Sequence, residues 1–210
     1  MSARSYTRRQ LMAETSMPYV PINAALFART VAVTLPFAPT GTTWEFEGAV
    51  ARHSGTPTSN TVLYRFISYT GFNTNNTIIA FYMQNTTTFR VLPYTKHGQV
   101  LSFTVPSTAD SKIVFSAKTS SPREATVNGE TKTASLSTGT NASNRNISIG
   151  DYSIKQMAIV FWYFKAKQNG VVVHNYVPAR RKKDGVIGIW DKVTNGFYLP
   201  NSGTLTEFNG

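Results

Sequence analysis

Apolar and polar residues alternate along most of this chain, which is the pattern of β-strands that are buried on one face. Residues 42–53 show it most clearly, because Trp44 and Phe46 would face one side of a sheet and Glu45 and Glu47 the other. The same pattern predicts five further strands in the first part of the chain, at 61–69, 77–84, 87–94, 99–105 and 112–118. The segments between them are rich in Gly, Asn, Thr and Pro, as turns are.

Asn-Gly pairs occur at three places in the second half of the chain. This dipeptide supplies the two positive φ angles that a type I′ hairpin turn requires. It predicts hairpins at 128–129, 169–170 and 195–196. No helical pattern of ten residues or more follows position 17, so we expect an all-β fold, a two-sheet antiparallel jelly-roll sandwich.

Four consecutive cations lie between two of the expected strands. We expect Pro178 to end one strand, because proline cannot donate to a central ladder, and Gly185 to begin the next. The bend between them then holds Arg180, Arg181, Lys182 and Lys183. Charge runs are usually solvated faces, which favours an exposed turn. A contact with phosphate, sulfate or carboxylate groups is the alternative interpretation.

The composition limits the possible partners more than the possible folds. The 210 residues carry a formal net charge of +11 and contain no cysteine, which excludes disulfides, thiolate metal sites and cysteine nucleophiles. Such a positive balance favours polyanions. No apolar run is long enough to span a membrane, and no element suited to reading base edges is evident, so we expect neither a membrane span nor sequence-specific nucleic-acid binding.

From about Lys112 onward the chain resembles the laminin-G-like branch of the concanavalin A-like jelly rolls, in the version found in bacteriophage and prophage virion proteins. Three blocks carry the resemblance, "ATVNGETKTAS" (125–135), "ISIGDY" (147–152) and the run from 157 to 208 with "YVPARRKKDGVIGIWDKVTNGFY" at its centre. The resemblance implies an antiparallel sandwich used for glycan binding or virion architecture, and it supplies no shared catalytic residue.

A loop between two expected strands has the composition of a sugar-binding site. Aromatic rings stack under sugar faces, and amides fix the orientation of the sugar. The candidate carbohydrate-binding residues are Tyr69, Phe72, Asn73, Asn75 and Asn76. The aromatic run Trp162, Tyr163 and Phe164 is interpreted instead as core and cross-strand pairs.

Neither catalysis nor metal binding is expected. Glu45 and Glu47 would share a face, as the paired carboxylates of a retaining glycosidase must, but ordinary solvent-facing strand positions explain them better. Asp110 and Asp151 are each isolated, and no His-x-x-x-His or His-Glu pairing links the three histidines, His53, His97 and His174. We therefore expect no enzyme, no metal and no cofactor.

The functional expectation is a non-enzymatic bacteriophage virion protein, a capsid decoration or fibre component at the virion surface. Residues 18–210 would form the sandwich domain. Residues 1–17 would form an arm that docks on a capsid protein or a neighbouring copy in a homo-oligomer through Arg4, Arg8 and Arg9. The alternative is a lectin module that binds host or surface glycans, and a glycan hydrolase that uses Glu45 and Glu47 comes third.

Overall fold

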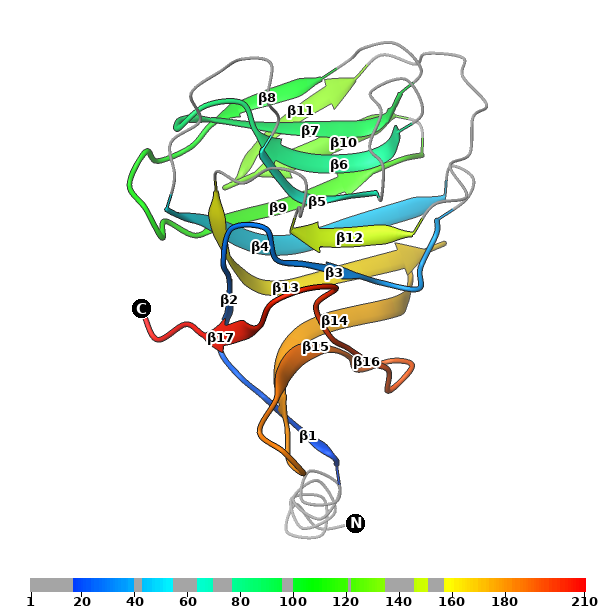
Figure 1. The fold of residues 1–210 in the computed structure, drawn as a ribbon. Coiled ribbons are helices and arrows are strands. Elements are labelled where there is room, and N and C mark those ends of the chain that lie inside the picture. Colours follow the sequence, from blue (N-terminus) through cyan, green and yellow to red (C-terminus); the bar gives the residue numbers. More distant parts are fainter. Residues whose placement is uncertain are drawn as a thin grey trace, which may run out of the picture.

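The fold is an all-β sandwich of two antiparallel sheets (Figure 1). The computed structural model describes residues 17–39, 43–54, 64–69, 77–95, 100–120, 122–134, 146–150 and 157–210. Within these ranges every regular element is a strand, and no helix suited to crossing a membrane is found there.

The large sheet has eleven strands, and eight of them follow one another in the order β11-β10-β9-β4-β13-β14-β15-β16. Strand β1 pairs with β14, and β2 pairs with both β13 and β17. The bounds are β1 Tyr19–Pro21, β2 Ala25–Phe27, β4 Trp44–Ser54, β9 Ile113–Lys118, β10 Arg123–Val127, β11 Glu130–Ala134, β13 Ala158–Gln168, β14 Val171–Arg181, β15 Ile187–Asp191, β16 Phe197–Tyr198 and β17 Leu205–Glu207. The small sheet has six strands in the order β3-β12-β5-β6-β7-β8. Its bounds are β3 Ala32–Thr34, β5 Tyr64–Tyr69, β6 Thr77–Met83, β7 Thr88–Thr95, β8 Leu101–Thr104 and β12 Ile147–Gly150.

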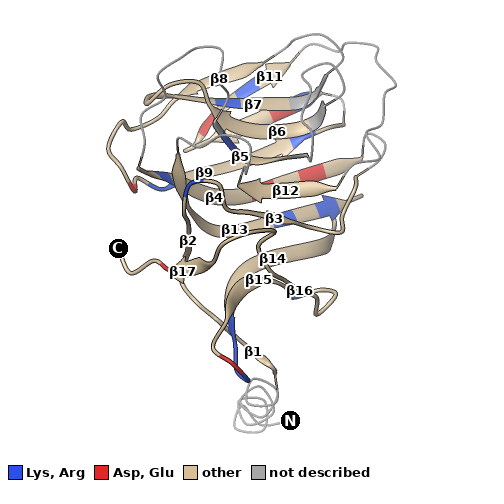
Figure 2. Cartoon of the chain, viewed as in Figure 1, with Lys and Arg blue, Asp and Glu red and all other residues tan. Residues whose placement is uncertain are grey.

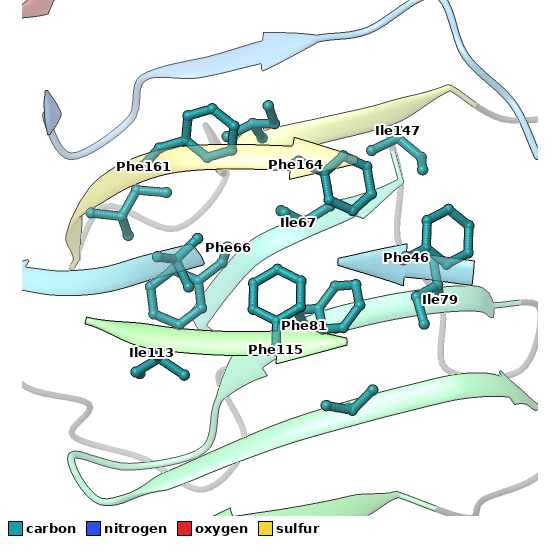
Figure 3. Packing of buried hydrophobic residues seen from close by; sticks show 14 of the residues in the cluster. Phe46, Phe66, Ile67, Ile79, Phe81, Ile113, Phe115, Ile147, Phe161 and Phe164 are labelled. Carbon is teal, nitrogen blue, oxygen red and sulfur yellow. The ribbon is translucent and has the colours of Figure 1, made fainter. Parts of the chain in front are cut away.

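Aromatic rings from both sheets fill the space between them (Figure 3). Phe81 of the small sheet packs on Phe115 of the large sheet, with ring centres 4.1 Å apart. Phe164 stacks on Phe46 and meets Phe81 edge-on. The alternation in 42–53 is confirmed, since Trp44, Phe46 and Val50 are buried in the core while Glu45 and Glu47 are partly exposed.

Two of the three expected hairpin turns are confirmed. Asn128 and Gly129 both have positive φ, as do Asn169 and Gly170. The third prediction is wrong in its geometry, because only Asn195 has a positive φ at 195–196. There the connection between β15 and β16 is longer, and the Asp191 carboxylate holds it by accepting hydrogen bonds from Val193 and Thr194.

The expected end of a strand at Pro178 is also wrong. Strand β14 continues through Pro178 to Arg181, so the bend comprises residues 182–186 only. Proline is tolerated because β14 changes its neighbour here: Tyr176 is the last residue paired with β13, and Ala179 is paired with Pro21 of β1. The β14–β15 hairpin and β1 thereby extend beyond the edge of the small sheet (Figure 1).

Candidate functional site

Strand β13 carries two aromatic side chains on the face that points away from the core. Phe161 and Phe164 belong to the core cluster, and strict alternation would send Trp162 and Tyr163 to opposite faces. A register shift between Phe161 and Tyr163, in the pairing with β4, breaks that alternation. Trp162 and Tyr163 therefore both lie on the outer face, half-buried. The expectation of core and cross-strand pairs places Phe164 correctly in the core, whereas Trp162 and Tyr163 are only half-buried, with Trp162 packed against a smaller apolar cluster.

An ammonium group lies over each of these two rings. Lys112 Nζ is 5.0 Å from the centre of the Trp162 ring, and Lys165 Nζ is 5.2 Å from the centre of the Tyr163 ring. Both distances are within the range of a cation–π contact. Lys167 follows Lys165 on the same face. We call Lys112, Trp162, Tyr163, Lys165 and Lys167 the lysine–aromatic strip.

A carboxylate of the neighbouring strand β4 forms ion pairs with two lysines of the strip. Glu47 Oε1 lies 3.2 Å from Lys165 Nζ and 3.4 Å from Lys167 Nζ. Burial would raise the pKa of Glu47, but the hydrogen bonds and charges of the two lysines outweigh it and lower the pKa. Burial raises the pKa of Tyr163, and the charge of Glu47 raises it further. Glu47 is therefore ionised and Tyr163 protonated at neutral pH.

A small apolar cluster on the outer face supports Trp162. Phe208 meets its ring edge-on, with centres 6.2 Å apart. The cluster is Ala24, Ala51 and Val160, with Leu26, Trp162 and Phe208 packed against it. His53 also lies against Phe208, and its Nδ1 is 2.8 Å from Asp110 Oδ1. The indole is thus held in one place by packing.

A second histidine–aspartate pair lies at the end of β15. His174 Nδ1 is 2.7 Å from Asp191 Oδ2, and the Asp191 side chain is fully buried. The Asn175 backbone N–H also donates to this carboxylate. The histidines that the sequence shows as isolated are therefore paired in two cases. Among the described residues, no group of three His, Cys, Asp or Glu side chains could hold a metal ion.

The basic bend contains two ion pairs. Arg180 pairs with Glu207 of β17, and Arg181 donates two hydrogen bonds to the Asp184 carboxylate. The Lys182 backbone N–H donates to the Pro18 carbonyl, while the side chains of Lys182 and Lys183 are exposed. Arg180 and Arg181 thus have carboxylate partners, and an oxyanion contact at this bend stays a prediction. Figure 2 shows Lys and Arg spread over both sheets rather than gathered at this bend.

We predict that Lys183→Gln alters the free energy of unfolding by less than about 0.5 kcal/mol, since the Lys183 side chain is exposed on the bend and such substitutions usually have small effects. Thermal unfolding of the variant beside the wild-type protein measures this. A loss above about 1 kcal/mol would show that the Lys183 ammonium group supports the bend.

Several residues chosen from the sequence cannot be placed. Arg4, Arg8 and Arg9 of the expected arm lie outside the described residues, and so do Phe72, Asn73, Asn75 and Asn76 of the expected sugar-binding loop. Tyr69 ends β5, where it pairs with Ile147, but its side chain is also outside the described part. The arm and the loop remain predictions.

Comparison with known proteins gives a likeness in fold. No protein-family model and no curated protein matches the chain. One similar solved structure is a family 7 alginate lyase, A1-II′, in complex with substrate, at 10% identity and a TM-score of 0.44, over 65% of this chain and 65% of that one. Another is the marine family 7 alginate lyase AlyA1 from Zobellia galactanivorans, at 13% identity and a TM-score of 0.38, over 63% of this chain and 64% of that one. The chain thus spans just under two thirds of each.

The sheet topology confirms the expected two-sheet sandwich, and the comparison corrects the functional expectation. The similar structures are alginate lyases, which are enzymes, and nothing in the comparison gives a phage setting. The expectation of a non-enzymatic virion protein is therefore wrong on this finding, as is the expectation that the chain is no enzyme. The likeness itself is one of fold alone.

Proposed function

We propose that this protein binds carbohydrate, and in particular acidic polysaccharide, through the lysine–aromatic strip on the outer face of β13. The observation that supports this most is the pair of partly exposed rings, Trp162 and Tyr163, each with a lysine ammonium group over it. Aromatic faces bind the apolar faces of sugars. Lysine is a mobile point charge that suits carboxylate and sulfate groups.

The charge balance of the strip favours an anionic ligand. Of its three lysines, Lys165 and Lys167 contact Glu47 of β4, and Glu45 is opposite Lys167 in the strand pairing. The third, Lys112, lies over Trp162. Positive charge therefore remains on this face, and the chain as a whole carries +11. Such a balance attracts polyanions over long range.

The strip also has the shape that an extended ligand needs. It follows one strand from Trp162 to Lys167, five steps of about 3.3 Å, so it is roughly 16 Å long. Hydrogen bonds to β4 hold that stretch of β13 in register on one side. Sites on strands are more precisely held than sites on loops. The resemblance of the C-terminal part to laminin-G-like jelly rolls, a branch used for glycan binding, agrees with this proposal.

A sugar that stacks on Trp162 must move the Lys112 ammonium group aside. The lysine stem is flexible and the side chain is exposed, so this movement costs little. The displaced ammonium group can then pair with a carboxylate on the same or the next sugar. A neutral sugar offers no such replacement, which predicts discrimination between acidic and neutral polysaccharides.

We predict that Trp162→Ala weakens binding to a polyuronate on the order of tenfold, since loss of a central aromatic contact costs more than about 1 kcal/mol. Affinity electrophoresis or calorimetry with polygalacturonate, and with a neutral glucan for comparison, measures this. Tyr163→Phe keeps the ring and should bind as the wild-type protein does.

The matched control uses a second lysine–indole pair outside the strip. Lys192 Nζ lies 5.7 Å from the centre of the Trp190 ring at the β15–β16 connection. Lys112→Gln should reduce polyuronate affinity several-fold, and Lys192→Gln should leave it unchanged. Equal losses in the two variants would show that general charge, and not the strip, binds the polysaccharide.

A further inference from the structure

A long stretch of the chain contains no carboxylate. Between Glu47 and Asp110 there is no Asp or Glu, while Arg52, Arg65 and Arg90 lie within it. The stretch supplies strands β5 to β8 of the small sheet, and β3 and β12 contain no Asp or Glu either. The small sheet therefore carries cationic side chains and no acidic residue of its own.

Two of these arginines lie in one row across four strands. Arg65 is paired with Tyr82, Tyr82 with Arg90, and Arg90 with Ser102. Directly opposed residues share a face, with their Cβ atoms roughly 4.5–5.5 Å apart. The residues next to them in sequence point into the core, namely Phe66, Phe81, Met83, Phe89, Val91, Leu101 and Phe103. The row is therefore on the outer face of the small sheet, opposite to the face that meets the large sheet.

The centre of this row is removed from water. Tyr82 is only 2% exposed and packs in a small cluster with Ala80 and Leu92. Burial raises the pKa of Tyr82, and a hydrogen bond with Arg90 partly offsets that effect. The tyrosine is thus neutral, hydrogen-bonded to Arg90 and paired across the strands with Arg65, and electrostatic interactions are stronger here than in water.

The Arg90 side chain has a buried donor without an acceptor. The Nε of Arg90 is buried, and among the residues that the structure describes no acceptor meets it. Buried N–H groups are nearly always hydrogen-bonded, so such a group indicates a missing partner. Guanidinium groups match the paired oxygens of carboxylate, sulfate and phosphate groups.

We propose that Arg65, Tyr82, Arg90 and Ser102 bind one oxyanion on the outer face of the small sheet. The ligand is a sulfate, phosphate or carboxylate group, either free in solution or attached to a sugar. The Arg90 Nε–H donates a hydrogen bond to one oxygen of the anion, and Arg65 supplies the second positive charge. The hydroxyl groups of Tyr82 and Ser102 can donate further hydrogen bonds to it. This site is on the other sheet from the lysine–aromatic strip, so neither proposal depends on the other.

The experiment measures the Tm of the protein as the sulfate concentration is increased. Chloride is replaced by sulfate, so that the ionic strength stays constant. Binding should raise the Tm of the wild-type protein and then saturate, by on the order of 5 °C at a hundredfold excess over Kd. Arg90→Gln should abolish the saturating rise. Arg29→Gln, which removes an exposed arginine from a turn outside the small sheet, should keep it. A rise that is linear and unsaturated, or equal in the wild-type protein and Arg90→Gln, would overturn the proposal, since sulfate stabilises most proteins non-specifically.

Two further measurements cover a variant that folds poorly and separate the sources of the anion. Calorimetric titration of the wild-type protein alone with inorganic phosphate should show saturable heat, and its absence would contradict the site. Arg90→Lys keeps the charge but loses the planar fork, and should weaken phosphate binding at least several-fold. Glucuronate in place of phosphate tests a sugar-borne carboxylate: binding of either ligand supports the site, and binding of neither overturns it.

Discussion

Replacing Phe164 with alanine is expected to lower the free energy of unfolding by about 3–5 kcal/mol, the largest effect of any single change considered. Its side chain is fully buried at the middle of β13. The ring stacks on Phe46 at 5.7 Å and on Tyr176 at 6.3 Å, and it meets Phe81 of the opposite sheet edge-on. Alanine would leave a cavity where the two sheets meet, and the neighbouring rings are too constrained by one another to fill it.

Denaturant unfolding of the variant and the wild-type protein gives this difference. Val171→Ala is the matched control, because Val171 is 64% exposed at the start of the adjacent strand, and it should cost less than about 0.5 kcal/mol. A loss below about 2 kcal/mol for Phe164→Ala would mean that the core relaxes around the missing ring. That outcome would contradict a core in which the ring contacts of Phe164 with Phe46 and Phe81 hold its surroundings in place.

The fold was largely predictable because alternation is a local property of a chain. The strand expected at 112–118 is observed as Ile113–Lys118, and the one expected at 77–84 as Thr77–Met83. In both cases the side chains on one face of the strand make apolar contacts. Such a face requires apolar residues at alternate positions of one short segment, so the sequence of that segment alone reveals it. Turn chemistry is equally local, which explains why two Asn-Gly hairpins were correct.

Predictions failed where the answer depends on a distant strand. Pro178 is compatible with β14 only because the neighbouring strand changes from β13 to β1 at that place. The third Asn-Gly turn differs because Asp191 holds the backbone of the connection with its side chain. The pairing of His174 with Asp191 also follows from the register of β14 against β15, and neither residue reveals it in the sequence.

Only part of the candidate site could be predicted from the sequence. Tyr163, Lys165 and Lys167 alternate with the buried Phe164, so the pattern places these three on one face. Three consecutive aromatic residues conceal this, because they suggest a strand buried on both sides. The position of Trp162 on the same face follows from a β-bulge, which depends on the pairing with β4. The Arg65–Tyr82–Arg90 row likewise needs the register of three strands, although the acid-free stretch around it was a signal in the composition.

The second large effect is expected for Asp191→Asn, with a loss of about 2–4 kcal/mol in the free energy of unfolding, because hydrogen bonds to buried charged groups are among the strongest. The carboxylate bonds to His174 at 2.7 Å and to the Thr194 hydroxyl at 2.8 Å. It also accepts hydrogen bonds from the backbone N–H groups of Asn175 and Val193. An amide group keeps the shape but has only one acceptor oxygen, so donors are left unsatisfied in a fully buried place. Asp110→Asn is the control, since the pair of Asp110 with His53 is about one third exposed and should contribute about 1 kcal/mol or less.

The pH dependence of stability gives an independent test of the same carboxylate. Burial would raise the pKa of Asp191, but the hydrogen bonds from His174, Asn175, Thr194 and Val193 outweigh it and lower the pKa to about 2. A carboxyl group with a lowered pKa in the folded state stabilises the protein above its unfolded pKa of about 3.9, and this contribution is lost as the pH falls towards 2. The wild-type protein should therefore lose about 2 kcal/mol more than Asp191→Asn between pH 5 and pH 2, measured by denaturant unfolding at each pH. Parallel curves for the two proteins would show that the Asp191 carboxylate is not stabilised in the folded state, and would leave the β15–β16 connection without the electrostatic anchor described here.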